Sequence, residues 1–263
     1  MENEMNNMLH LNTASFRDPE ASPEGPKTTE PLDPDIAKRN AELVERFGTL
    51  LFSASAQEIL AWAHEHAPGP LAVTLSMENT VLAELAKRYL PGADFLFLDT
   101  EYHFPETLEV ADAVEQRYPQ HRLVRAKAQL SRAEQDEVYG PNLYLGNPGA
   151  CCRMRKVEPL AVHMSPYVGW ITGLRRADGP TRAEAPALSL DATGRLKISP
   201  LVTWTLEETE AFEQDNDLII HPLTRQGYPS IGCATCTMPV AEGEDPRAGR
   251  WAFAAKTECG LHE

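Results

Sequence analysis

The sequence lacks any long hydrophobic run, and this absence limits the kind of protein it can be. Within its 263 residues no apolar stretch approaches the roughly 20 residues that a membrane span requires. The N-terminus has no basic patch followed by an apolar stretch, so no secretory signal is predicted. We therefore expect no membrane partner and a cytoplasmic, reducing environment. In such an environment, paired cysteines are more often metal ligands or redox groups than disulfides.

Positive charge is scarce, with 24 Lys and Arg against 39 Asp and Glu. The net charge of −15 argues against nucleic-acid binding, which needs a basic surface. The charge is uneven. Residues 1–33 carry seven acids, two bases and several Pro, Ser and Thr, which predicts a disordered acidic segment. A basic island in 151–182 suits a small anionic ligand, or is an ordinary solvated surface. Its bases are Arg153, Arg155, Lys156, Arg175, Arg176 and Arg182.

Cysteine is also rare, and the five present fall into two groups. Cys151 and Cys152 are adjacent, Cys233 and Cys236 form a CxxC pair, and Cys259 stands alone near the end of the chain. This distribution suggests a division of labour in which four cysteines hold a group and one reacts.

Four thiolates can hold a tetrahedral zinc ion or a [4Fe–4S] cluster. The CxxC pair has ordinary metal-ligand spacing. Adjacent cysteines rarely bind one zinc together, because their side chains diverge, whereas a cluster with several metal vertices accepts adjacent ligands more easily. The pattern therefore favours iron–sulfur, with zinc, or a redox CxxC beside a coincidental CC, as alternatives.

Hydrophobic periodicity predicts alternating helices and strands. Ser55 and Thr205 are predicted helix caps. Alternation implies βαβ units and a parallel sheet in one α/β domain over 34–240. After about residue 222 the chain is rich in Pro and Gly, and 241–263 is expected to be a mobile tail that carries Cys259. The expected helices are 34–51, 56–67, 78–90, 105–118 and 201–215, and the expected strands are 69–75, 93–100 and 121–127.

Ligands of parallel sheets bind at the carboxyl ends of the strands. The sequence is polar or charged at three predicted strand ends, which are 74–80, 98–104 and 170–176. We therefore expect the functional site at this edge of the sheet.

Four segments carry a resemblance to a known family. "CCRMRKVEPL", "GWITGLRRADGPTRA", "YPSIGCATCTMPVAEGEDPRAGRW" and "KTECGLHE" resemble the assimilatory sulfonucleotide reductases. The order CC, CxxC and ECGLH is similar to the iron–sulfur branch, the adenylyl-sulfate reductases, and the resemblance extends from about residue 70 to the C-terminus. It implies an adenine nucleotide α-hydrolase-like fold, a Rossmann-like parallel sheet with flanking helices.

The resemblance also implies a chemistry. A [4Fe–4S] cluster would be bound by Cys151, Cys152, Cys233 and Cys236. The Cys259 thiolate would attack the sulfur of adenosine 5′-phosphosulfate, giving an S-sulfocysteine and AMP. Thioredoxin would then release sulfite. The reaction belongs to sulfate assimilation and cysteine biosynthesis.

Cations must offset the repulsion between this anionic substrate and a thiolate. Lys156, four residues after Cys152, is expected between the cluster and the substrate sulfate. Arg175, Arg176 and Arg182 are further candidates. So are Arg247 and Arg250 in "DPRAGRW".

The strand-end loops supply the expected nucleotide contacts, with two departures from the family pattern. Thr74 and Ser76 lie in the first loop, and the resemblance places an Asp where this chain has Asn79. Asp99 and Thr100 are expected either to orient the adenosine or to cap the helix that follows. Glu101 replaces a Gly and adopts positive φ less cheaply, so the local backbone is expected to differ.

Three alternatives remain at this stage. The first is the same reaction on 3′-phosphoadenylyl sulfate, although enzymes using that substrate usually lack the cluster cysteines. The second is an ATP pyrophosphatase-type ligase, which needs a glycine-rich SGGxDS loop that "TLSMENT" does not match. The third is a zinc or iron–sulfur interaction module, which leaves "ECGLH" and the arginine pairs unexplained.

Overall fold

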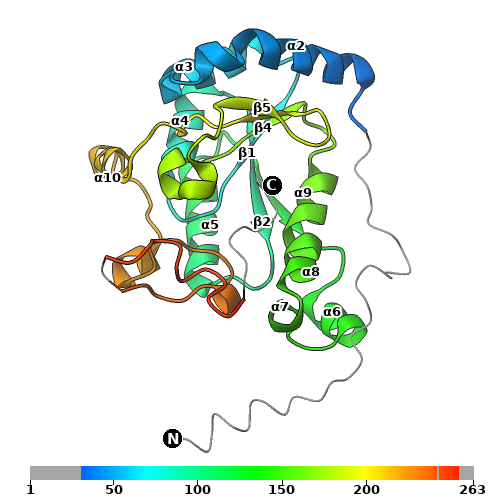
Figure 1. The fold of residues 1–263 in the computed structure, drawn as a ribbon, viewed down its shortest axis with the longest axis vertical. Helices are drawn as coiled ribbons and strands as arrows, with labels where there is room; N and C mark the ends of the chain where they lie inside the picture. The colour runs from blue at the N-terminus through cyan, green and yellow to red at the C-terminus, as the bar shows by residue number, and fades with distance from the viewer. Residues whose placement is uncertain (1–30, 242, 255–263) are drawn as a thin grey trace, which may run out of the picture.

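A six-stranded sheet lies at the centre of the computed structural model, which describes residues 31–241 and 243–254 (Figure 1). The strand order is β3-β2-β1-β4-β6-β5, and all neighbours are parallel except β5 and β6. The predicted parallel sheet is thus confirmed, with one additional antiparallel edge strand. The strands are β1 (Leu71–Thr74), β2 (Asp94–Asp99), β3 (Leu123–Lys127), β4 (Gly169–Ile171), β5 (Leu188–Leu190) and β6 (Leu196–Ile198).

Successive side chains along a strand point to opposite faces of the sheet. Both faces of this sheet are buried, each in its own hydrophobic cluster. Val73 and Phe95 belong to the larger core, which also contains residues of the helices on one face. Ala72 and Leu96 belong to a smaller cluster on the other face, together with Tyr167. The result is a three-layer α/β arrangement, the class predicted from the alternation of elements.

The helices predicted by periodicity are present. Ser55 and Thr205 each cap a helix through a capping box, in which the hydroxyl accepts the N–H three residues on. Both predicted caps are therefore confirmed. These helices are α2 (Pro34–Leu51), α3 (Ala56–His66), α4 (Val81–Tyr89), α5 (Pro105–Arg117) and α10 (Leu206–Asp215).

Two helices begin later than predicted. The helix expected over 201–215 begins at Leu206, directly after its cap Thr205. The helix expected from residue 78 begins at Val81, because the chain first makes a loop after β1. Met77 in this loop has a φ of 65°, which no helix accommodates. The loop places the polar side chains of 76–79 beyond the end of the strand.

A run of short helices fills a segment for which the sequence predicted no element. Each has eight residues or fewer, which is too little for a periodic pattern. A π-helical turn, a geometry often found at functional sites, joins the last two. The segment contains α6 (Arg132–Tyr139), α7 (Leu143–Gly146), α8 (Pro148–Cys152), the π-helix η2 (Arg153–Val157) and α9 (Glu158–His163).

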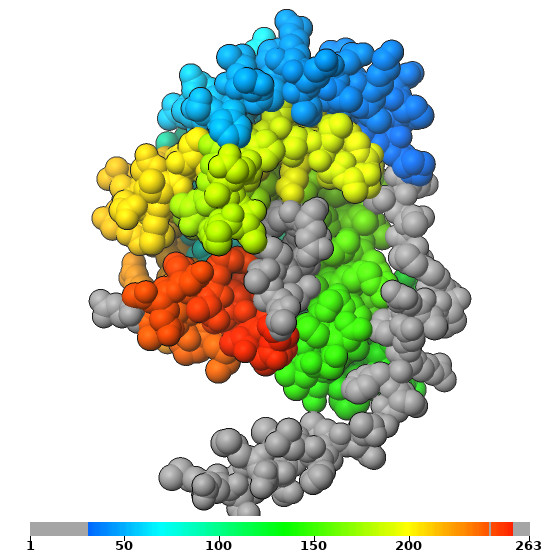
Figure 2. Space-filling model, in the orientation of Figure 1, coloured from blue at the N-terminus to red at the C-terminus, as the bar shows by residue number. Residues whose placement is uncertain are grey.

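The C-terminal part of the described chain has only short 3-10 turns, in line with its Pro and Gly content. They are η5 (Pro222–Gln226) and η6 (Ala234–Cys236). Figure 2 shows this segment, orange to red, against the green segment that carries α7 and α8. Of the predicted tail 241–263, the described part ends at Ala254 and Cys259 lies outside it. The predicted segment 1–33 also lies outside, apart from residues 31–33.

No helix in the described part of the chain is both long and apolar enough to cross a membrane. The three polar segments predicted at strand ends follow β1, β2 and β4. Because these strands are neighbours and parallel, their carboxyl ends meet at one edge of the sheet.

The fully buried His221 holds the segment after α10 against α5. Its Nδ1 accepts the N–H of Leu223 at 3.2 Å, so in the neutral ring Nε2 donates to the hydroxyl of Thr107 at 2.9 Å. Burial lowers the pKa of His221 below its ordinary value of 6.5. The unfolded chain therefore binds a proton that the folded chain resists as the pH falls below about 6.5.

We predict that His221→Asn reduces the dependence of unfolding free energy on pH between about 7.5 and 5.5. The asparagine oxygen can still accept from Leu223, and loss of the Thr107 bond costs about 1 kcal/mol at neutral pH. Urea unfolding at both pH values measures the effect. His64→Asn, at an exposed position of α3, is the control and keeps the wild-type slope. Equal slopes for wild type and His221→Asn would contradict the assignment.

Candidate functional site

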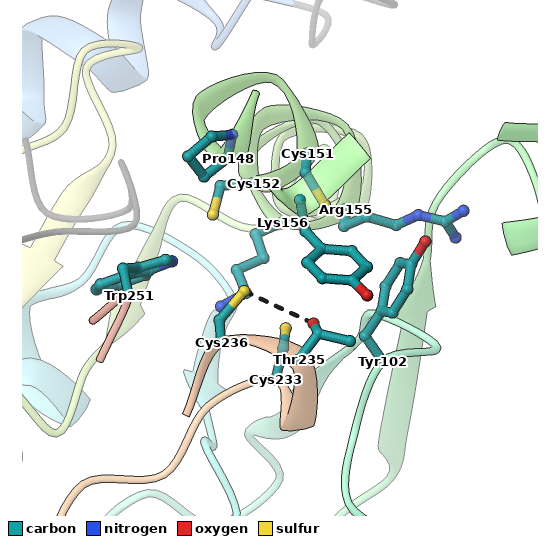
Figure 3. Close-up of a pocket in the computed structure, with 11 residues that line it drawn as sticks. Tyr102, Pro148, Cys151, Cys152, Arg155, Lys156, Cys233, Thr235, Cys236 and Trp251 are labelled. Atoms are coloured by element: carbon teal, nitrogen blue, oxygen red, sulfur yellow. Dashed lines mark hydrogen bonds between the residues drawn. The ribbon is translucent and has the colours of Figure 1, made fainter. Parts of the chain in front are cut away.

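The structure brings the four paired cysteines to one pocket, from segments about 80 residues apart in the sequence. Figure 3 shows Cys151 and Cys152 on the helix side, facing Cys233 and Cys236 on the opposite loop. All four are buried and none forms a disulfide. The remaining lining residues are Tyr102, Tyr144, Pro148, Arg155, Lys156, Thr235 and Trp251.

The adjacent pair ends a short helix. Asn147 caps α8, accepting the N–H of Ala150 at 2.9 Å with its side chain. Cys151 and Cys152 are the last residues of that helix, and η2 follows at once. The local structure therefore fixes the two thiols on a helical backbone and brings Lys156, in η2, to the same pocket.

The CxxC pair is held by backbone contacts to the β2 loop. The N–H of Ala234 donates to the Tyr102 carbonyl at 2.7 Å, and Thr237 Oγ1 donates to the Cys233 carbonyl at 2.9 Å. Thr100 Oγ1 lies 3.3 Å from Cys233 Sγ. The loop after β2 thus positions one thiol directly.

Trp251 closes the pocket from the C-terminal side. It is only 1% exposed and belongs to the hydrophobic cluster that contains all four cysteines. The backbone N–H of Trp251 donates to the Cys236 carbonyl at 3.0 Å, and the backbone N–H of Met238 donates to the Gly249 carbonyl at 2.9 Å. The described part of the C-terminal segment is therefore attached to the CxxC loop.

Burial opposes ionisation of two of the thiols. It raises the pKa of Cys151 to about 12, with a further contribution from the neighbouring cysteines. Burial also raises the pKa of Cys236. Redox-active CxxC pairs need an exposed thiol of low pKa, so the environment disfavours that alternative. Four buried thiols become thiolates together only when a cationic group binds them.

The donor set distinguishes the two candidate groups. Within the described ranges, no three His, Cys, Asp or Glu side chains form a group that could hold one metal ion between them. A single zinc needs such a set, with sulfur about 2.3 Å from the metal. The four thiols instead line one shared pocket. In a [4Fe–4S] cluster each iron takes one cysteine, so this all-thiol set fits a multinuclear cluster better than one ion.

Several lining residues were missed by sequence reasoning. Arg155 was counted only as a member of the basic island, yet it is fully buried and donates to Gln135 Oε1 at 2.7 Å. Tyr102 and Trp251 were not singled out at all. Proximity in sequence to Cys152 was the available signal for Arg155, but Tyr102 and Trp251 carried none without the fold.

Two of the predicted basic residues are paired with one acid. Arg175 Nε donates to Asp178 Oδ1 at 2.8 Å and Arg175 Nη1 to Thr209 Oγ1 at 2.9 Å. Arg182 Nη1 donates to Asp178 Oδ2 at 3.2 Å. The Asp178 carboxylate therefore compensates much of the charge of this part of the island.

Arg176 lies away from the cysteine pocket. Its guanidinium donates to the carbonyl oxygens of Ala185 and Phe52, and its Cζ lies 3.8 Å from the Phe52 ring centroid. These contacts attach it to the C-terminal end of α2. None of these side-chain contacts is with another predicted site residue.

Arg250 lies near the CxxC loop. Its Nη1 donates to Ser230 Oγ at 3.2 Å and to the Ile231 carbonyl at 3.3 Å, and its buried Nε has no hydrogen-bond partner. The N–H of Arg247 donates to Asp245 Oδ1, which orders the loop before Arg250.

The end of β1 and the loop after it contact the end of β4 and the segment just before the CxxC pair. Thr74 Oγ1 donates to the Ile171 carbonyl at 2.9 Å, while Ser76 is exposed. Glu78 Oε2 accepts the N–H of Ile231 at 3.1 Å, two residues before Cys233. Burial raises the pKa of Glu78. Asn79, one of the departures from the family pattern, accepts the N–H of Val81 at 3.2 Å.

Asp99 and Thr100 do not cap the following helix. The cap position of α5 is Phe104, and no side chain accepts there. Asp99 Oδ1 instead accepts the N–H of Glu101 at 3.1 Å, and Thr100 Oγ1 accepts the N–H of Tyr102 at 3.3 Å. The capping alternative is therefore wrong, and both side chains stabilise the loop that meets Cys233.

We predict that Gly249→Ala lowers the unfolding free energy by about 2 kcal/mol or more and increases the solvent exposure of Trp251. A Cβ at this position would collide with the Met238 carbonyl oxygen, a backbone atom that cannot move alone. Urea unfolding and tryptophan fluorescence measure the two effects. Ala248→Gly, at the exposed neighbouring position, is the matched control. Wild-type stability in Gly249→Ala would contradict the packing described.

The comparisons with known proteins agree with this geometry. The family model for the phosphoadenosine phosphosulfate reductase domain matches residues 70–239. The chain is 49% identical over 222 residues to an adenosine 5′-phosphosulfate reductase of Mycolicibacterium smegmatis, covering 84% of this chain and 94% of that one. It is 46% identical over 243 residues to the Rhodococcus erythropolis protein of the same name, covering 87% and 98%.

A solved structure shares the fold. The crystal structure of phosphoadenylyl-sulfate reductase from Candida auris, a phosphate complex, has a TM-score of 0.63 and 26% identity, covering 75% of this chain and 97% of that one. The predicted adenine nucleotide α-hydrolase-like fold is confirmed. With its family domain, its sheet and its relatives in agreement, the chain belongs to the phosphoadenosine phosphosulfate reductase family, which confirms the resemblance of its four segments to sulfonucleotide reductases.

Proposed function

We propose that this protein reduces adenosine 5′-phosphosulfate to sulfite and AMP, with Cys259 as nucleophile and thioredoxin as reductant. The observation that carries the proposal is the pocket lined by four buried cysteines and Lys156. Support comes from nearly half-identical proteins that bear the name adenosine 5′-phosphosulfate reductase.

The proposed reaction has two transfers. The Cys259 thiolate attacks the sulfate sulfur, a sulfur–sulfur bond forms, and the bond from sulfur to the phosphate oxygen breaks with AMP as leaving group. A thioredoxin thiolate then attacks the Cys259 sulfur, and sulfite leaves with the electron pair of the broken bond. The second thioredoxin thiol closes its disulfide and frees Cys259, so thioredoxin supplies both electrons.

Lys156 and Arg250 are the proposed cations at the reacting end of the substrate. Lys156 is supported by its place among the cysteines, where Figure 3 shows its side chain reaching from η2 toward Cys236. Arg250 is supported by its unpartnered buried Nε. Such charges screen the repulsion between the anionic substrate and the attacking thiolate. Arg247 is a further candidate, on the same loop.

We assign Arg175, Arg182, Thr74, Ser76, Asp99 and Thr100 to the nucleotide-facing edge of the sheet. Thr74 and Asp99 are the last residues of β1 and β2, and the others follow β1, β2 or β4, whose carboxyl ends meet. Arg176 has the weakest support, because its contacts attach it to the end of α2.

The four cysteines would hold a [4Fe–4S] cluster, which fits the buried all-thiol donor set. Bound there, the cluster would supply a fixed charge distribution beside the substrate sulfate without changing its oxidation state. The protein residues around it hold the thiols among buried apolar side chains.

Mobility of the C-terminal tail would allow Cys259 to meet substrate and thioredoxin in turn. Since Trp251 is buried among the cysteines, that movement is expected to begin after Trp251 rather than at residue 241. The need for reduced thioredoxin fits the proposed cytoplasmic location, where thiols stay reduced. The acidic segment 1–33 is proposed to stay disordered, since it is poor in apolar residues.

The alternative is the same reaction on 3′-phosphoadenylyl sulfate. The fold similarity to the Candida auris enzyme favours it, but at 26% identity against 49% for the relative from Mycolicibacterium smegmatis. One additional cation near the ribose would be enough to hold a 3′-phosphate, so the substrate preference has to be measured.

We predict about four iron and four sulfide per chain in anaerobically purified protein. Cys152→Ser should lose most of both, together with the visible absorbance, because one of the four ligands is removed. Cys259→Ser is the matched control and retains the wild-type content. Zinc in place of iron would contradict the cofactor assignment while leaving the family membership intact.

We predict that incubation with adenosine 5′-phosphosulfate, without reductant, adds about one SO3 unit to Cys259. Intact-protein and peptide mass spectrometry locate the adduct, which should be absent in Cys259→Ser and disappear on addition of reduced thioredoxin. In a parallel incubation, 3′-phosphoadenylyl sulfate should label much more slowly. The absence of any adduct would refute the mechanism, and faster labelling by the second nucleotide would reassign the substrate.

A further inference from the structure

Glu101 occupies a backbone conformation that glycine adopts more easily. It follows β2 with a φ of 59°, in the left-handed region where a side chain carries an energetic cost. The backbone conformation suited to glycine is therefore kept although the residue is not glycine. Strain of this kind persists where other contacts of the same residue offset it.

The offsetting contact is an ion pair with a buried arginine. Glu101 Oε2 lies 2.7 Å from Arg155 Nη1, and the Arg155 side chain is 1% exposed. Within the described ranges, no other carboxylate forms an ion pair with Arg155. A buried charge without a partner is strongly destabilising, so this carboxylate compensates a charge that the interior could not otherwise hold.

The ion pair is one end of a network that reaches the cysteine pocket. Arg155 Nε donates to Gln135 Oε1 at 2.7 Å, and Gln135 Nε2 donates to the Tyr102 hydroxyl at 3.4 Å. The Arg155 guanidinium carbon lies 5.5 Å from the Tyr102 ring centroid, and both residues line the pocket. In Figure 3 the guanidinium extends past Tyr102, away from Cys152.

We propose that Glu101 is a positioning residue that holds Arg155 behind Tyr102 and offsets its positive charge beside the four cysteines. Arg155 is three residues from Cys152 on the same helical backbone, so fixing its head group also fixes the segment that carries the thiols. The carboxylate makes the surroundings of the cysteines one charge less positive than the pocket residues alone suggest. Its effect on substrate rests on the proposed function.

The first test is the sign of a stability change, which needs no assumption about function. Glycine relieves the backbone strain at residue 101, so a purely local effect would raise the melting temperature of Glu101→Gly. The proposal expects a fall of several degrees, because Arg155 is left buried and unpaired. Adding Arg155→Met to Glu101→Gly should recover most of the loss. A melting temperature at or above wild type in Glu101→Gly would overturn the positioning role.

The second test separates charge from shape. Glu101→Gln keeps an oxygen that accepts from Arg155 but removes the negative charge. We expect KM for adenosine 5′-phosphosulfate to fall about threefold at low salt with kcat unchanged, and the difference to shrink at about 0.5 M salt. Glu137→Gln removes the same charge from an exposed position of α6 and should leave KM unchanged.

The two tests fail separately. If Glu101→Gln turns over normally with wild-type KM at every salt concentration, the charge effect is refuted. If the wild-type protein does not reduce adenosine 5′-phosphosulfate, the proposed function is refuted, and the order of melting temperatures still decides whether Glu101 positions Arg155.

Discussion

Four buried thiols from two distant segments share one pocket, and much of the surrounding structure holds this arrangement in place. The β2 loop holds the CxxC segment through the Tyr102 carbonyl and the Thr100 hydroxyl. Trp251 covers it from the C-terminal side, and the β1 loop reaches it through Glu78. Since the loops after β1 and β2 belong to the carboxyl edge of the sheet, this edge and the cysteine pocket form one continuous structure.

The basic island of the sequence divides into parts with different roles once it is folded. Asp178 compensates Arg175 and Arg182, while Arg176 joins the end of α2. Arg155 is buried behind Tyr102 and paired with Glu101. A net count of charges along the sequence therefore overstates the positive potential at the site, because acids brought in from other segments offset it.

Sequence reasoning predicted the elements that are long enough to show a repeated apolar pattern. The helices from α2 to α5 and the strands β1 to β3 repeat apolar residues over enough positions to be recognised. The three-residue β5 and β6 and the helices between 132 and 163 are too short for this. The cysteines were predicted as a set because their spacing is itself the signal. Tyr102 and Trp251 were not, since only the tertiary fold brings them to the pocket. Glu101 has a positive φ, and its ion pair with Arg155 is a contact that only the fold reveals.

The burial of Trp251 has a geometric consequence for Cys259. Cys259 lies eight residues after Trp251, and an extended chain spans at most about 3.5 Å per residue. With Trp251 fixed among the cysteines, the Cα atom of Cys259 can lie no farther than about 28 Å from that of Trp251. Under the proposed mechanism, a protein that collects sulfur from Cys259 must therefore dock within that radius of the cysteine pocket.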